Sequence, residues 1–248
     1  MQVPGEEIKK REIYTDIRAL GPVIIRLDGR AFHQLAQTMQ LKRPFDEQFS
    51  SIMAGVCEYC IRDSGLAPVF AYTFSDEISL FLNTLPFNGR IEKLDTTFAS
   101  YAASVFTILA RLQHPVAFDA RVIPITMDII HPYLIWRQNE AWRNHINAYC
   151  QQALVKEGFS TSEAAGMLFG MPASKLHEMM FQRGVNLSQT PSWQRRGILV
   201  SREIIQKPGY NKKTEKEIVT TRRIIQTNRD LPLFSSPEGE EYIKKLCV

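Results

Sequence analysis

The order of apolar segments in the first half of the chain constrains its fold more than any other feature. A β-branched run predicts a buried strand, and a segment with helical periodicity follows it. Two alternating runs then predict a β-hairpin, before a second helix and a last strand. In order, these segments cover residues 22–28, 46–64, 67–83, 90–112 and 118–129. Strand, helix, two strands, helix and strand form the ferredoxin-like arrangement. We therefore predict an α+β fold, with an antiparallel sheet and both helices on one face.

The second half of the chain has a different pattern of apolar residues. Residues 131–181 show helical periodicity, with Ser160 and Glu163 placed as a capping box at the start of one helix. From Arg196 onward, two alternating runs predict a second β-hairpin with a tip rich in Pro, Gly and Lys. We expect a core in residues 1–130 and, in residues 131–248, a helical and β-hairpin elaboration that completes the same unit.

Composition argues against a membrane-spanning or disulfide-stabilised protein. No apolar run approaches the length of a membrane span, and the N-terminal MQVPGEEIKK lacks the apolar segment of a signal peptide. Four cysteines make no disulfide framework in 248 residues, and the single Cys57-x-x-Cys60 pair has no second pair to complete a zinc site. We expect a cytoplasmic protein with structural thiols and no membrane partner.

Positive charge is concentrated in the C-terminal third of the chain. Residues 193–229 hold ten Lys and Arg against three Glu, a net charge of +7, whereas the whole chain carries only +4. Two interpretations are open. The segment is either the footprint of a polyanionic partner or a solvated face of a hairpin.

The first apolar run ends abruptly in Asp28-Gly29-Arg30, within VIIRLDGRAF. One interpretation is a turn, because Asp-Gly is common in turns. The other is a metal ligand at a strand end. Asp76 lies at the tip of the predicted hairpin, and the ferredoxin-like order allows both carboxylates to meet at one edge of the sheet. Magnesium is typically bound by one or two carboxylates plus substrate phosphates. The Gly29 carbonyl is a further candidate ligand, and Glu77 is a third acid at the tip.

Positively charged side chains near these acids suit phosphate groups. Arg26 and Arg30 flank Asp28, while Arg90 and Lys93 lie in the first turn of the following helix. A helix N-terminus adds N–H donors and the positive end of a dipole. Two metal ions that bridge a triphosphate would stabilise both the attacking and the leaving oxygen atoms. The combination predicts metal-dependent nucleotide chemistry.

Two motifs in this order and spacing, RLDGRAFH and FSDEISLFL, resemble the tRNA-histidine guanylyltransferase family, whose members add nucleotides in the 3′–5′ direction. YLIWRQNEAWRN and RIEKLDTTFAS are similar to further segments of that family. The resemblance covers about residues 20–200. It implies a polymerase palm, which agrees with the strand order derived above.

The resemblance also implies roles for individual residues. Asp28, the Gly29 carbonyl and Asp76 would bind two Mg²⁺ ions, and Asp28, Asp76 and Glu77 would form the catalytic group. The residues implied to contact the nucleotide, ATP or GTP, are Arg26, Arg30, His33, Ala36, Asp46, Ser75, Arg90 and Lys93. The implied reaction has two steps. ATP or GTP activates a tRNA 5′-monophosphate, and the 3′-hydroxyl of an incoming nucleotide then attacks the activated phosphate.

Contacts to tRNA are expected in the second half of the chain. The candidate residues are Arg137, Asn144, Arg195, Arg196, Lys212 and Lys213. Trp142 stands where eukaryotic members of the family have histidine, and residues 175–180 also depart from their pattern. The sequence therefore resembles the bacterial and archaeal branch more closely, which implies templated addition of G opposite C. The resemblance further implies a homo-oligomer, either a dimer or a tetramer.

Two other function classes are open at this point. A nucleotide cyclase on the same palm would use the same pair of aspartates, but it would not need a basic RNA-binding segment. A non-catalytic RNA-binding protein would not need Asp28 and Asp76 at one place. A cyclic product would favour the cyclase, and absence of nucleotide incorporation would favour the binding protein.

Overall fold

The computed structural model describes residues 5–211 and 216–247. Its centre is a six-stranded sheet in the order β4-β1-β3-β2-β5-β6, in which every neighbouring pair is antiparallel. The strands are β1 (Val23–Arg30), β2 (Phe70–Phe74), β3 (Glu77–Leu82), β4 (Ala117–Pro124), β5 (Ile198–Asn211) and β6 (Lys216–Asn228). The first four strands have the predicted ferredoxin-like order, and the C-terminal hairpin extends the sheet beside β2. The predicted α+β fold is confirmed.

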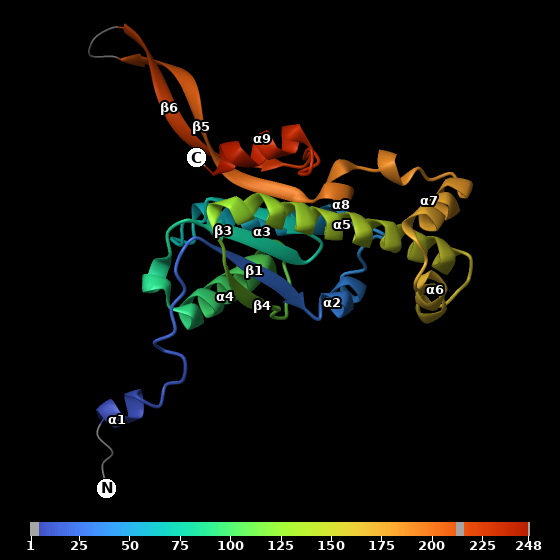
Figure 1. Ribbon diagram of the computed structural model, residues 1–248, viewed down its shortest axis with the longest axis horizontal. Coiled ribbons are helices and arrows are strands. Elements are labelled where there is room, and N and C mark those ends of the chain that lie inside the picture. Colours follow the sequence, from blue (N-terminus) through green and yellow to red (C-terminus); the bar gives the residue numbers. More distant parts are fainter. Residues whose placement is uncertain (1–4, 212–215, 248) are drawn as a thin grey trace.

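Helices cover both faces of the sheet, and the alternation of β1 shows why. Val23, Ile25 and Leu27 face a core formed with α3 (Glu47–Arg62) and α4 (Ile91–Leu109). Ile24 faces the other way, toward α5 (Met127–Lys156) and α9 (Pro237–Leu246). The two helices of the ferredoxin-like order therefore share one face, as expected. The long α5 lies across the opposite face (Figure 1).

Two predicted strand ends were wrong. The last strand of the core was expected to reach residue 129, but β4 ends at Pro124 and α5 begins at Met127. Proline has no N–H to continue a ladder, and Ile130 instead packs as a buried helical residue in the second core. The first strand runs past its expected end at residue 28. Asp28 and the two residues after it still pair with β4.

The remaining elements lie mostly at the ends of the molecule. They are α1 (Gly5–Lys9), α2 (Phe32–Thr38), α6 (Thr161–Leu168), α7 (Ala173–Gln182), α8 (Ser192–Arg196) and the short 3₁₀ helices Pro86–Gly89 and Leu187–Gln189. The predicted capping box of α6 is confirmed by reciprocal hydrogen bonds between Ser160 and Glu163. Helices α6 and α7 pack on the C-terminal half of α5 around a small core of their own.

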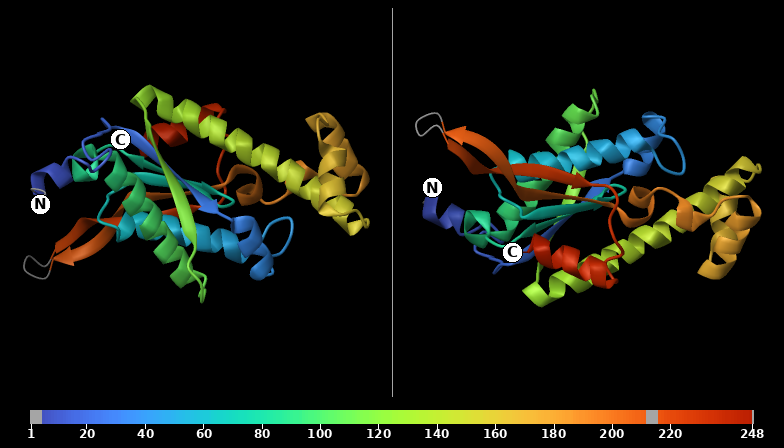
Figure 2. Two further views of the ribbon diagram at one scale, coloured as in Figure 1. Left: turned by 90° about the horizontal axis from the view of Figure 1, so that it is seen from below. Right: turned by 90° about the horizontal axis from the view of Figure 1, so that it is seen from above.

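The C-terminal hairpin projects well beyond the rest of the sheet, as the views in Figure 2 show. Two candidate tRNA contacts, Lys212 and Lys213, lie outside the described residues. Within the described ranges, no helix combines the length and apolar character that crossing a lipid bilayer requires.

Candidate functional site

The two aspartates singled out by the sequence lie together at one end of the sheet. Strands β2 and β3 are joined by a tight turn at Ser75 and Asp76, in which Ser75 has a φ of 54°. The Gly29 N–H, at the end of β1, donates a hydrogen bond to the Asp76 carbonyl over 3.1 Å. Asp28 is paired across the ladder with Glu77. The convergence expected from the strand order is therefore present.

The electrostatics of this group fit a divalent cation. Burial, together with the neighbouring Asp28 carboxylate, raises the pKa of Asp76. Burial also raises the pKa of Glu77, opposed by Arg137 and Arg26. Carboxylates that repel one another in a partly buried site favour a cation between them. Among the described residues, no three His, Cys, Asp or Glu side chains are grouped so that they alone would hold a metal ion. A magnesium ion here would need phosphate oxygen atoms from a substrate, which is its usual mode of binding.

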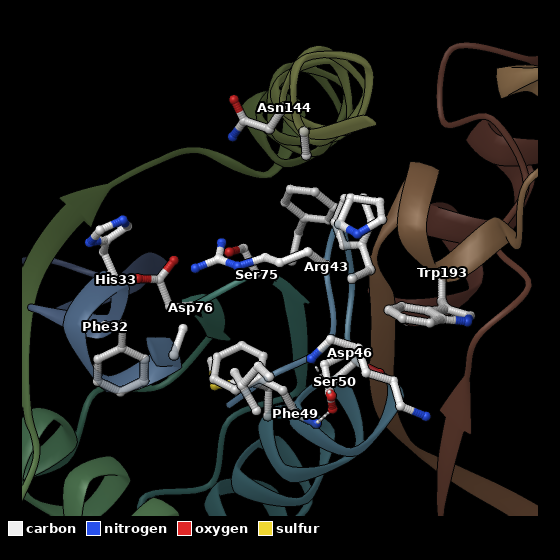
Figure 3. Close-up of a pocket in the computed structure, with 18 of the residues that line it drawn as sticks. Phe32, His33, Arg43, Asp46, Phe49, Ser50, Ser75, Asp76, Asn144 and Trp193 are labelled. Atoms are coloured by element: carbon white, nitrogen blue, oxygen red, sulfur yellow. Dashed lines mark hydrogen bonds between the residues drawn. The ribbon is translucent and has the colours of Figure 1, made fainter. Parts of the chain in front are cut away.

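Gly29 is also required by packing. A Cβ atom at this position would lie 2.5 Å from the ring of Phe32. That ring is buried against Phe49, Phe106 and Phe118. The glycine therefore allows α2 to start directly behind the Asp28 strand, with the adjacent His33 beside Asp76 (Figure 3).

A cavity of about 430 Å³ opens beside Asp76. Six of the residues predicted from the sequence line it, namely His33, Ala36, Asp46, Ser75, Asp76 and Asn144. They come from α2, from the loop before α3, from the turn between β2 and β3, and from α5. Figure 3 labels all of them except Ala36, and shows Asn144 above the space and Asp46 below it. Asn144 was predicted to contact tRNA, but the structure places it at the cavity.

Asp46 fixes the loop that forms one side of the cavity. Its carboxylate accepts hydrogen bonds from the N–H groups of Lys42, at 3.0 Å, and Phe49, at 2.8 Å. Burial opposes ionisation of this carboxyl, but these backbone donors outweigh burial and lower its pKa. Asp46 is therefore also the N-cap of α3.

The same loop supplies cations that the sequence analysis missed. Lys42 and Arg43 both line the cavity. In Figure 3 the Arg43 guanidinium points toward Ser75 and Asp76. A possible signal was their position just before Pro44 and the N-cap Asp46. That position identifies a constrained loop, but it does not show which way the loop faces.

Aromatic side chains form another wall that the sequence analysis missed. Phe45 lines the cavity and is stacked on His145, with ring centroids 5.5 Å apart. Trp193 lies edge-on to Phe45 at 6.2 Å, and Tyr149 lies at 6.0 Å. His145 is fully buried, and burial lowers its pKa to about 4. It is therefore a neutral packing group at physiological pH, and Trp142 stacks on its ring at 5.4 Å.

Two of the predicted phosphate contacts lie elsewhere. Strand β3 leads away from Asp76, and α4 begins only after the chain has reached the opposite end of the sheet. Arg90 is bridged there to Arg18, and Lys93 is exposed in the first turn of α4. The structure does not bring these two residues beside the aspartates of the same chain. Six residues of strand span roughly 20 Å.

The other predicted cations have mixed positions. Arg30 is exposed at the end of β1, whereas Arg26 lies on the α5 face with its guanidinium 5.7 Å from the centre of the Trp136 ring. Arg137 was expected on an RNA-binding surface, but it pairs with Glu77 at 2.8 Å. Arg195 and Arg196 are half-buried and donate to the carbonyls of Thr190 and Leu231, each at 2.7 Å.

Both halves of the chain match models of known protein families. Residues 5–126 match the family described as tRNAHis guanylyltransferase, and residues 128–232 match the domain described as Thg1 C terminal domain. The chain belongs to this family.

Relatives of known name are similar over most of the chain. A probable tRNA(His) guanylyltransferase of Dictyostelium discoideum is 30% identical over 205 residues, which cover 77% of this chain and 78% of that protein. The tRNA(His) guanylyltransferase 1 of Arabidopsis thaliana is 28% identical over 203 residues, which cover 77% of this chain. The match spans only 36% of the length of that plant protein.

Among solved structures, a bacterial tRNA(His) guanylyltransferase (Thg1)-like protein in complex with ATP has the same fold. Its TM-score is 0.78 at 22% identity, over 99% of both chains.

Proposed function

We propose that this protein is a metal-dependent nucleotidyltransferase that adds nucleotides to the 5′ end of tRNA. The observation that carries the proposal is that Asp28 and Asp76 lie close together beside a cavity of a size that suits a small-molecule ligand. Membership of the tRNAHis guanylyltransferase family supports the choice of substrate. The solved complexes of similar bacterial proteins with ATP and with GTP support these two nucleotides as substrates.

Asp28, Asp76 and the Gly29 carbonyl would hold two Mg²⁺ ions. When bound, such ions neutralise phosphate charge and stabilise the attacking and leaving oxygens. The base of the nucleotide is proposed to lie against Phe45 and Trp193, since an aromatic wall suits a flat ring. Arg43 and Lys42 supply positive charge for its phosphates.

The proposed reaction has two balanced steps. In the first, an oxygen of the tRNA 5′-monophosphate attacks the α-phosphorus of ATP or GTP, and pyrophosphate leaves. In the second, the 3′-hydroxyl of the incoming nucleotide attacks the activated 5′ phosphorus, and the activating nucleoside monophosphate leaves. Catalysis of this kind depends on positioning and charge, which an aspartate pair beside a cationic loop can provide.

Selection of the added nucleotide is proposed to come from base pairing with the opposite strand, so that G is added opposite C. Trp142 supports this assignment. It stands at the position where eukaryotic members of the family have histidine, and its ring packs on the buried His145 and on His177 of α7 instead of facing tRNA. We further propose residues 1–130 as the catalytic core and residues 131–248 as the part that contacts tRNA, through the charge of its projecting hairpin. Phosphate contacts of this kind position a substrate without reading its sequence.

We also propose that the protein works as a homo-oligomer in the cytoplasm. Several apolar side chains of the N-terminal segment are exposed in the single chain, namely Ile8, Ile13, Tyr14, Ile17 and Leu20. A second copy would cover such side chains. All four cysteines are free thiols, which fits a reducing compartment.

The test is nucleotide incorporation on tRNAs that lack their first nucleotide, with Mg²⁺ and each labelled triphosphate in turn. We expect G addition opposite C, and a switch to A when the opposing nucleotide is changed to U. Changing the anticodon is expected to alter the rate less than twofold. Addition of G whatever the opposing base would refute templating, and absence of any incorporation would refute the proposed activity.

A further inference from the structure

Three carboxylates lie side by side across the end of the sheet. In the ladder, Asp28 on β1 is paired with Glu77 on β3 and with Asp119 on β4. Directly paired residues of antiparallel strands carry their side chains on the same face, about 5 Å apart. Glu77, Asp28 and Asp119 therefore form a row of like charges. Like charges in such positions destabilise a sheet unless they are compensated.

The two outer carboxylates each have an arginine partner. Asp119 pairs with Arg121 at 3.5 Å, and both side chains are 55% exposed. Glu77 pairs with Arg137 at 2.8 Å, with only 18% and 13% of the two side chains exposed. Within the part of the chain that the structure describes, Asp28 and Asp76 are in no ion pair. Of these four carboxylates, only the two proposed metal ligands, Asp28 and Asp76, therefore lack an ion-pair partner in the described ranges.

Arg137 is held firmly in this position. Its guanidinium lies 4.5 Å from the centre of the Trp136 ring. The guanidinium of Arg26 lies 5.7 Å from the same ring centre. The neighbouring Gln138 ties α5 to the C-terminal segment through hydrogen bonds to Pro232 and Phe234. With 13% of its side chain exposed, Arg137 has little surface to offer RNA. A short, shielded ion pair is also much stronger than one in water.

We propose that Arg137 is a positioning residue that keeps Glu77 away from the metal site. By pairing with Glu77, it leaves Asp28 and Asp76 as the two free carboxylates that meet the metal and the substrate phosphates. Without Arg137, Glu77 would lose its ion-pair partner and stand next to Asp28, with Arg26 as a remaining cation nearby. The site would then bind a divalent ion more tightly with protein groups alone, in a geometry that excludes substrate phosphate. This inference rests on the proposed function, but it concerns metal binding, which is measured without any reaction.

The experiment is Mn²⁺ binding in the absence of nucleotide, followed by the electron paramagnetic resonance signal of the free ion. Manganese replaces magnesium at oxygen sites. The variants are Arg137→Met and the double variant Arg137→Met/Glu77→Gln, with Arg121→Met as the matched control. Arg121 compensates the exposed end of the same row, so its loss is screened by solvent.

We expect Arg137→Met to bind Mn²⁺ about threefold to tenfold more tightly than the wild type, because of Coulomb attraction at a partly shielded site. At saturating metal, the same variant is expected to lose at least about tenfold in the rate of nucleotide incorporation. The double variant, neutral at both positions, is expected to bind Mn²⁺ within about twofold of the wild type, because no charge is left unpaired. Arg121→Met is expected to stay within about twofold as well.

Two results would overturn the proposal. One is a folded Arg137→Met protein whose affinity for Mn²⁺ is unchanged or weaker, because Arg137 would then not restrain Glu77. The other is a double variant that loses fivefold or more in affinity, because Glu77 would then be a ligand itself. If Arg137→Met does not fold, the double variant still decides the question. Absence of incorporation by the wild type would refute the proposed function, whereas these affinities would be measured all the same.

Discussion

The two ends of the central sheet carry similar residue types but differ in what those residues can do. At one end, Asp28 and Asp76 lie together beside a cavity lined by Lys42 and Arg43. At the other end, Arg90 and Lys93 surround the start of α4, with Arg18 nearby. In the sequence, two positively charged residues in the first turn of a helix were enough to predict a phosphate-binding site there. An antiparallel strand thus separates residues that are close in sequence. The second end also has a cavity, of about 430 Å³ and lined by Arg18 and Arg90, but among the described residues the only acidic side chain that lines it is Asp16. The end with two clustered aspartates is therefore the one suited to metal–nucleotide chemistry.

The largest effect is expected at the carboxylate end. Asp28→Asn or Asp76→Asn should lower nucleotide incorporation by about a thousandfold, because each change removes a ligand that would hold the metals. Asp119→Asn is the matched control, since Asp119 stands in the same row but is exposed and paired with Arg121. Single-turnover incorporation measures all three variants. Equal losses for Asp119→Asn and Asp28→Asn would show that general charge, rather than a metal site, controls the rate.

A second prediction concerns the aromatic wall of the same end. His145 has a pKa of about 4 in the folded protein, below its value of about 6.5 in an unfolded chain. The unfolded state therefore takes up a proton first, so stability is full above pH 6.5 and falls as the pH decreases toward 4. The loss is about 3 kcal/mol.

His145→Gln should lack this loss, because glutamine does not titrate. Urea unfolding of both proteins at pH 7 and pH 4 measures the difference between their free energies of unfolding. Wild type and variant are expected to converge, or to change order, at the lower pH. Parallel pH profiles would mean that His145 is not the buried neutral group described above.

A third prediction compares one cation from each end directly. Arg43→Met should weaken nucleotide binding by about tenfold to a hundredfold, as expected for loss of a hydrogen bond between charged groups. Lys93→Met should change it less than about twofold, because Lys93 lies at the far end of β3, roughly 20 Å away. Equilibrium binding of a fluorescent GTP analogue measures both. A larger effect at Lys93 would mean that this cation reaches the aspartates of another copy of the chain.

Much of this end of the molecule was predictable because it depends on local signals and strand order. The β-branched run before Asp28 and the alternation around Asp76 define two strands, and the ferredoxin-like order makes them neighbours. The N-cap at Asp46 follows from a local pattern. The wall of Phe45, His145 and Trp193 was not predictable, because it joins three segments that are far apart in sequence. The pairing of Arg137 with Glu77 was missed for the same reason, since it depends on how α5 crosses the sheet.

A crystal structure of the protein with Mn²⁺ and a non-hydrolysable GTP analogue would show directly whether the two aspartates hold the metal. Anomalous scattering locates the metal, and the electron density locates the triphosphate. We predict manganese between Asp28 and Asp76, with the phosphates toward Arg43 and the base against Phe45. A triphosphate bound by Arg90 and Lys93 of the same chain, with no manganese at the two aspartates, would contradict this prediction.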